Sequence, residues 1–195
     1  MNLAEQLKNY TPYNEQEEKD RDLILALLQT YPDIYTRDNH TAHMTASAWV
    51  VSKDRKKVLM AYHNLYDSWA WLGGHCDGDE DLLHVALKEV REESGLAHVE
   101  AIDGEIFSVE VLTVDGHEKR GEYVSSHLHL NVTYLLEADS SQPLSSKPDE
   151  NKAVAWFEPD EVYTRSSEPW FVDRIYKKLN AKLAEFIEKE AQRKK

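Results

Sequence analysis

The sequence predicts an α/β (α+β) fold in which helices cover a mixed sheet. Segments of strand-like composition stand before, between and after segments with helical spacing, which is typical of this class. Of the 195 residues, 41% are hydrophobic, enough for a substantial core. No apolar run approaches the length of about 18 residues that a membrane span needs, so no membrane-spanning helix is expected. A chain of this length is expected to form one domain with elaborations, or at most a small second unit.

The N-terminal part is expected to be helical and then extended. Residues 1–38 are predicted to form a helical extension that Pro32 ends. Its apolar part consists of Leu23, Leu25, Leu27 and Leu28. The segments MTASAWVVS and KVLMAYH, around residues 43–62, then predict two strands joined by a charged KDRK turn.

The remainder of the chain alternates strands, a loop and helices. Strands are expected around residues 105–114 and 127–137, followed by a polar loop at 139–151. AVAWF predicts a last strand, and EPDEV a helical turn that begins at its proline. One long amphipathic helix is expected from Pro169 to the end. The predicted organisation is a helical extension (1–38), a central α/β domain (39–168) and a C-terminal helix packed on it (169–195).

Charge and cysteine content exclude several functional classes. A net charge of −13 argues against a nucleic acid polymer as partner, because such a surface needs basic patches. It does not argue against small phosphorylated substrates, since a bound divalent cation can invert the local field. The single Cys76 has no partner for an internal disulfide, and MNLAEQLKNY lacks the order of a signal peptide. A cytoplasmic protein without a membrane partner is therefore expected.

Residues 74–96, GHCDGDEDLLHVALKEVREESGL, contain the most informative pattern. Asp79 or Asp81 can cap a helix start, and Gly95 stands where a left-handed helix end is expected. On such a helix Glu89 lies three and four residues before Glu92 and Glu93, so the three carboxylates share one side. Like charges at this spacing repel, by about 0.2–0.5 kcal/mol per pair, and a hard divalent cation with oxygen ligands would offset that repulsion.

This segment resembles the Nudix box, whose pattern is Gly, five residues, Glu, seven residues, then Arg-Glu-apolar-any-Glu-Glu-any-Gly-apolar. The positions that match without a gap are Gly74, Glu80, Glu89, Val90, Glu92, Glu93, Gly95 and Leu96. Lys88 replaces the usual Arg; it keeps the charge but loses the planar, bidentate geometry of a guanidinium group.

The resemblance to Nudix hydrolases implies an α/β/α sandwich with a mixed sheet. It also implies an enzyme that cleaves the diphosphate linkage of a nucleoside diphosphate joined to another moiety, with Mg²⁺ or Mn²⁺ as cofactor. Dimers are frequent in the family, so a homodimer is possible. The implied metal ligands are the side chains of Glu89, Glu92 and Glu93 and a backbone carbonyl near Gly74.

Other residues are predicted to support the reaction. Glu80 and Lys88 would hold the metal ligands in place, and Glu92 and Glu93 are candidate catalytic residues. Glu150, from the later polar loop, is a further candidate base, because family members often take an acid from such a loop. Which glutamate acts as the base is left open.

Three histidines are candidates for substrate binding. His75 follows the two glycines of the box directly, and His127 and His129 alternate on an expected strand, so they share a face. They are expected to contact substrate or metal, or simply to be hydrogen-bonded or exposed.

Two rival functions remain open on sequence grounds. Isopentenyl-diphosphate isomerase has a similar fold and metal-binding histidines, and His40, His43 and His75 suggest it, although WLGGHC lacks the corresponding segment of that family. A non-catalytic Nudix-fold module that binds a nucleotide metabolite is the other, which the Lys88 exchange keeps open.

Overall fold

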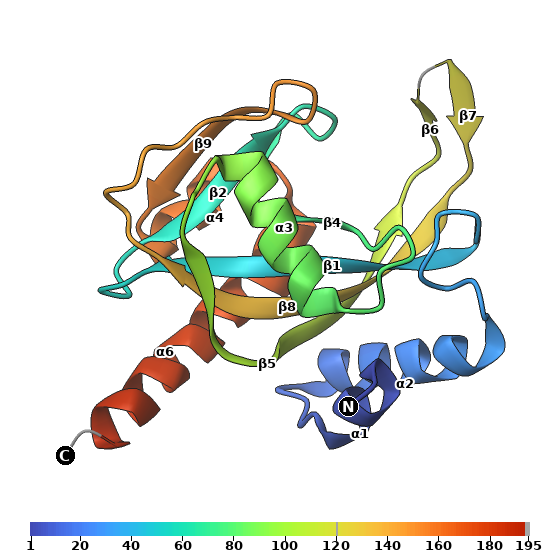
Figure 1. Cartoon of the computed structure of the whole chain (residues 1–195), viewed down its shortest axis with the longest axis horizontal. Helices are drawn as coiled ribbons and strands as arrows, with labels where there is room; N and C mark the ends of the chain where they lie inside the picture. Colours follow the sequence, from blue (N-terminus) through green and yellow to red (C-terminus); the bar gives the residue numbers. More distant parts are fainter. Residues whose placement is uncertain (120, 194–195) are drawn as a thin grey trace. The chain divides into compact units, whose positions relative to one another are not determined.

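The computed structural model describes residues 1–119 and 121–193 and confirms the mixed α/β class. Two helices precede the sheet, α1 (Leu3–Asn9) and α2 (Glu15–Thr30). The first half of the sheet consists of β1 (Ala42–Ser52), β2 (Val58–His63), β3 (Ser68–Ala70) and β4 (Leu72–His75). The helix α3 (Leu82–Ser94) follows, as the box pattern predicts (Figure 1).

The second half begins with the long strand β5 (Val99–Val114). A short hairpin, β6 (His117–Lys119) and β7 (Glu122–Val124), was not predicted. The strands β8 (His127–Ala138) and β9 (Asn151–Phe157) then complete the sheet, close to the predicted ranges.

The C-terminal region is helical but not one uninterrupted helix. A 3₁₀ turn (Pro159–Glu161) leads into α4 (Val162–Arg165). After α5 (Pro169–Phe171), a π-helical turn (Val172–Tyr176) precedes α6 (Lys177–Arg193). None of the helices in the described ranges is long and apolar enough to span a membrane.

The seven-stranded sheet has the strand order β3-β2-β1-β8-β5, with β4 paired to β1 and β9 paired to β2. The β2–β9 pairing is antiparallel, from Val58 opposite Phe157 to His63 opposite Asn151. By its contacts the chain divides into two units, and the division falls within β1, β4, α3, β5 and β8. The first unit comprises residues 1–47, 73–86 and 103–134, and the second comprises 48–72, 87–102 and the chain from 135 onward.

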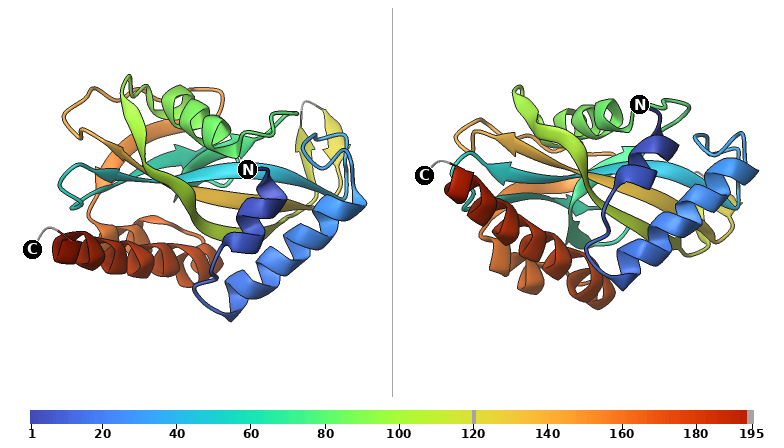
Figure 2. Two further views of the ribbon diagram at one scale, coloured as in Figure 1. Left: turned by 60° about the horizontal axis from the view of Figure 1, so that its bottom comes forward. Right: turned by 90° about the horizontal axis from the view of Figure 1, so that it is seen from below.

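In the first unit a buried polar network connects α2 to the strands. Glu17, fully buried, accepts hydrogen bonds from Tyr10 and from Ser108 of β5. Asn131 of β8 donates to Glu110 at 2.9 Å. Buried carboxylates are tolerated only when they are hydrogen-bonded, so this network fixes where α2 packs along β5 (Figure 2).

The apolar face of α2 differs from the prediction. Ile24 is fully buried, whereas Leu23 is 40% exposed, and the predicted extension consists of two helices with α2 ending at Thr30, before Pro32. On a helix that turns 100° per residue, Ile24, Leu27 and Leu28 share one face; Leu27 and Leu28 are half-buried there, and Leu23 is the exposed member of the run.

In the second unit helices lie on both sides of the strands. Figure 2 shows α6 on one side and the C-terminal half of α3 on the other. The ring of Tyr176 stacks on buried Trp49 of β1, with 5.8 Å between centroids. Arg55, in the turn after β1, pairs with Glu137 of β8 at 2.5 Å. This unit thus shows the layered arrangement that the sequence predicts.

Candidate active site

Both ends of α3 carry the caps that the sequence predicts. The Asp81 carboxylate accepts from the backbone N–H of His84 at 3.0 Å, and Asp79 accepts from the N–H of Asp81 at 2.9 Å. Gly95 adopts φ +70° beyond the last helical residue. Val85, Ala86 and Val90 are buried on one face. The helix is therefore held at both ends and along its apolar face, which fixes the direction of its glutamates.

The three glutamates of α3 differ in exposure. Glu93 is 4% exposed, and the side chains of Glu89 and Glu92 are 12% and 40% exposed. The Lys88 ammonium lies 3.5 Å from Glu89 Oε1 and 3.7 Å from Glu92 Oε1. Two carboxylates thus face one cation, which offsets the repulsion expected from their spacing.

Their protonation equilibria also differ. Burial raises the pKa of Glu89 above its ordinary value; Lys88 opposes the rise and Glu92 adds to it. A hydrogen bond from Lys147 lowers the pKa of Glu92. Neighbouring carboxylates of one helix are therefore held in opposite electrostatic environments.

The loop before β9 is anchored to the C-terminal end of α3. Ser145 donates its backbone N–H to the Ser94 carbonyl at 2.9 Å, and the Asn151 side chain donates to the Glu93 carbonyl at 3.0 Å. A Cβ on Gly95 would lie 2.0 Å from Ser145 Oγ. The glycine of the box thus has two roles here: it permits a positive φ, and it leaves room for this loop.

The anchored loop brings a cation to the glutamates. The ammonium of Lys147 lies 3.0 Å from Glu92 Oε2 and 3.1 Å from Glu150 Oε1. Although burial opposes its charge, hydrogen bonds to Glu92 and Glu150 raise the pKa of Lys147. Sequence reasoning selected Glu150 but missed Lys147, because a lysine in a polar loop gives no signal until the loop is placed.

The donor set fits a hard divalent cation. Carboxylate oxygens are the ligands that Mg²⁺ and Mn²⁺ prefer. The oxygens of Glu89 and Glu92 already face shared ammonium groups, so they are directed toward positions of positive charge. Glu89 and Glu92 are therefore directed as ligands of such an ion would be, and the inclusion of Glu93 stays a prediction.

Two predicted residues of the box lie in the first unit. Gly74 is half-buried on β4, and Glu80 is exposed before α3. Gly73, directly before Gly74, passes close to β1: a Cβ there would lie 2.5 Å from the carbonyl oxygen of Ala46. Only glycine fits this approach, which sets the course of the chain into the box.

Histidines from three strands meet in the first unit. The ring centroid of His43, on β1, lies 5.1 Å from that of His75 on β4. It lies 4.8 Å from the centroid of His127 and 5.0 Å from that of His129, both on β8. The three predicted substrate-binding histidines are thus brought together around a fourth, which the sequence suggested only through the isomerase alternative. His40 is exposed.

Burial keeps two of these rings neutral. It lowers the pKa of His43, against a hydrogen bond to the Asn39 carbonyl that raises it. Burial also lowers the pKa of His129 to about 2, and the neighbouring His75 and His43 add to this shift. Uncharged imidazoles are the form that binds a metal ion.

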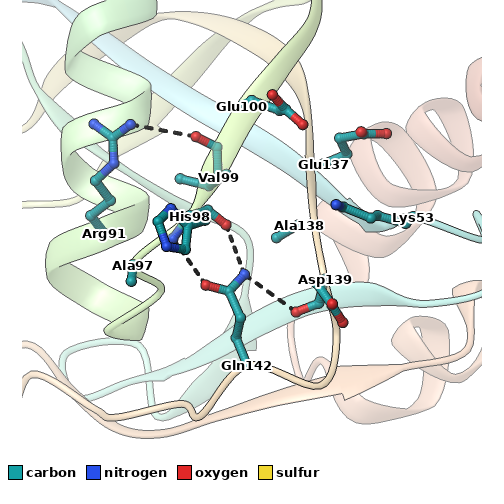
Figure 3. A pocket seen from close by; sticks show the side chains of 10 residues that line it. All are labelled: Lys53, Arg91, Ala97, His98, Val99, Glu100, Glu137, Ala138, Asp139 and Gln142. Carbon is teal, nitrogen blue, oxygen red and sulfur yellow. Dashed lines mark hydrogen bonds between the residues drawn. The ribbon is translucent and has the colours of Figure 1, made fainter.

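A pocket of about 360 Å³ in the second unit contains none of the predicted site residues. Figure 3 shows Gln142 directed at the backbone of His98, which it binds through both amide atoms at 2.8 and 2.9 Å. Arg91 donates to the Val99 carbonyl at 3.4 Å. Gln142 and Arg91 thus bind backbone groups at the edge of this pocket.

Comparison with known proteins agrees with the fold. The sequence matches the NUDIX domain family over residues 41–179. A C. elegans Ap4A hydrolase structure is similar with a TM-score of 0.53 and 17% identity, covering 74% of this chain and 96% of that one. The structure of the M. smegmatis Nudix hydrolase RenU is similar with a TM-score of 0.51 and 16% identity, covering 73% of this chain and 86% of that one.

The E. coli dihydroneopterin triphosphate pyrophosphohydrolase gives a TM-score of 0.50 with 14% identity, covering 68% of this chain and 94% of that one. No curated protein sequence matches significantly. At these identities the structural likenesses show the fold, whereas the family match spans more than half of the chain. The chain belongs to the NUDIX domain family.

Proposed function

We propose that the protein hydrolyses the diphosphate linkage of a nucleoside diphosphate joined to another moiety, and that it needs Mg²⁺ or Mn²⁺ to do so. The observation that carries this proposal is the convergence of carboxylates on cations at the end of α3. Lys88 and Lys147 lie 3.0–3.7 Å from oxygens of Glu89 and Glu92. Carboxylates directed in this way suit a divalent cation and a diphosphate bound to it.

Glu89, Glu92 and Glu93 would hold the ion through their carboxylates. When bound, it would polarise a phosphorus atom and neutralise charge on the leaving group. The contribution of the protein is placement: α3 fixes the three glutamates, and the anchored loop holds Glu150 beside Lys147. Lys88 and Lys147 are positioning residues, since each contacts carboxylates of the site.

The test is product release from a panel of nucleoside diphosphate derivatives with Mg²⁺ or Mn²⁺. The panel includes Ap4A and is extended by dihydroneopterin triphosphate, which contains no nucleoside; these are the compounds in the names of two proteins of similar fold. We expect metal-dependent cleavage of one class of compound. Glu93→Gln should lower kcat by at least about 100-fold, because a neutral amide holds a divalent cation poorly.

Glu188→Gln is the matched control: the same exchange at an exposed position of α6 should leave turnover unchanged. The absence of turnover across the panel, with Mg²⁺ binding intact in the wild type, would support a non-catalytic binding module instead.

Isomerisation of isopentenyl diphosphate is the second candidate, favoured by the contact between the rings of His43 and His75. Isopentenyl diphosphate therefore belongs in the panel, with formation of the rearranged alkene as the readout. Hydrolysis of a nucleotide without any such rearrangement would remove this candidate.

A further inference from the structure

The histidine cluster has a ligand geometry of its own. One ring nitrogen each from His43, His75 and His129 lies within 4.8 Å of the other two. His127 adds a fourth ring, whose Nε2 is 3.3 Å from Nε2 of His129. Zinc–nitrogen bonds of about 2.0–2.1 Å in a tetrahedron separate neighbouring nitrogens by about 3.3–3.4 Å. The Nε2 atoms of His127 and His129 already have this separation.

The hydrogen bonds of His43 determine which nitrogen is available. Its Nδ1 lies 3.1 Å from the Asn39 carbonyl, which can only accept, so Nδ1 carries the proton. The neutral ring then has its lone pair on Nε2. This atom is buried and has no hydrogen-bond partner among the described residues, in a side chain that is 4% exposed. A buried polar atom left in this way is costly unless something binds it.

The carbonyl that orients His43 is itself fixed. Asn39 is 5% exposed, and its side chain accepts from the N–H groups of Thr41 and Ala42 at 3.1 Å each. It also donates to Asp33 at 3.1 Å. A histidine whose second nitrogen donates to a held carbonyl is the usual arrangement around protein-bound metals.

His127 is oriented by the same device. Its Nδ1 donates to the Ser125 carbonyl at 2.8 Å, which leaves the Nε2 lone pair facing His129. His129 Nε2 can either donate a proton to this lone pair or share a bound cation with it.

We propose that His43, His75 and His129 bind a Zn²⁺-type transition-metal ion, with His127 as the fourth ligand. Imidazole nitrogens select zinc and its neighbours over Mg²⁺, whose preferred ligands are oxygens. Four protein ligands would close the coordination shell, as in structural zinc sites. The proposal is independent of the proposed hydrolysis, because it uses none of the glutamates of α3.

The test is metal binding by the full chain after removal of metals with a chelator. Zn²⁺ is titrated in competition with a chromophoric chelator, and Co²⁺ serves as a spectroscopic probe. We expect one Zn²⁺ per chain outside the glutamate site, retained in the Glu92→Gln/Glu93→Gln double variant. Bound Co²⁺ should give the intense visible absorption of a tetrahedral complex rather than the weak absorption of an octahedral one.

Single exchanges identify the ligands. His43→Gln and His129→Gln should weaken Zn²⁺ binding by at least about 100-fold, and the half-buried His127→Gln by about tenfold. His98→Gln, at an exposed position in the second unit, is the matched control and should bind as the wild type does. Circular dichroism shows which variants fold. If the variants at the buried positions do not fold, the Zn²⁺ affinities of His127→Gln and His98→Gln are compared to test the proposal.

Three results would overturn the proposal. The first is that the double variant shows no saturable Zn²⁺ binding. The second is that histidine variants that fold bind Zn²⁺ as tightly as the wild type does. The third is an octahedral Co²⁺ spectrum. Without such an ion, His127 and His129 would be joined by a single N–H···N hydrogen bond.

Discussion

The glutamates of α3 and the histidine cluster bring ionisable groups together in two different ways. Glu89, Glu92 and Glu93 lie within one turn of a single helix, and their common direction follows from helical geometry. His43, His75 and His129 come from β1, β4 and β8, far apart in the sequence. The first arrangement can be deduced from spacing, whereas the second depends on which strands meet.

The two regions also differ in the charge that they accept. The glutamates offer oxygens that already contact the ammonium groups of Lys88 and Lys147. The histidines offer nitrogens in rings that burial keeps neutral, such as His129. A hard, hydrated cation suits the first region, and a softer ion suits the second. The four predictions below test this difference, beginning with the largest expected effect.

Gly95→Ala tests how far the glutamate helix depends on contacts distant in sequence. Alanine would hold an unfavourable positive φ and would overlap Ser145, so we expect a loss of about 2–4 kcal/mol in the free energy of unfolding. Gly104→Ala is the control, with a similar φ of +76° but its nearest atom at 3.7 Å. Urea denaturation measures both. Equal losses would show that the contact with Ser145 is unimportant.

Zn²⁺ and Mg²⁺ should separate the two regions by thermal unfolding. An ion that binds only the folded state stabilises it by about 2.7 kcal/mol at one hundred times its Kd. We expect Zn²⁺ to raise the Tm in the wild type and in Glu93→Gln, but not in His129→Gln. Any change in Tm caused by Mg²⁺ should be the same in the wild type and in His129→Gln. A Zn²⁺ shift that disappears in Glu93→Gln instead would place the ion at the glutamates.

Lys88→Arg tests the departure from the family pattern. A guanidinium group can contact Glu89 and Glu92 with two separate donors, which one ammonium group does less well. We expect kcat to rise by about fivefold, which corresponds to about 1 kcal/mol of barrier. Lys88→Gln, without the charge, should lower it. Steady-state kinetics on the substrate found in the panel gives both values, and a lower kcat in the Arg variant contradicts the prediction.

Lys147→Met should change the protonation of Glu92. Of the four predictions, it should have the smallest effect on the fold. Because Lys147 lowers the pKa of Glu92, removing it should return that pKa toward its ordinary value. The contact contributes stability above the ordinary pKa, and this contribution is lost as the pH falls through the lowered pKa. Carboxyl-detected NMR titration of Glu92 is the measurement. Lys189→Met on α6, which pairs with Glu185, is the control and should leave Glu92 unchanged.

Local patterns in the sequence predicted the fold class and the extent of α3 correctly. Asp81 and Gly95 were assigned as helix ends from their residue types alone, and both act as such. The same approach failed for the apolar face of α2, where Ile24 rather than Leu23 is buried. Adjacent apolar residues do not show which of them faces the core until the helix has a partner.

By itself the sequence determined a mixed α/β chain with an acidic, capped helix, because hydrophobic periodicity and capping are properties of residues close together in the chain. Only the tertiary structure placed Lys147 beside Glu92 and His43 beside His75, His127 and His129. Loop anchoring and strand pairing depend on contacts between residues far apart in sequence. The spacing of those residues along the chain does not predict such contacts.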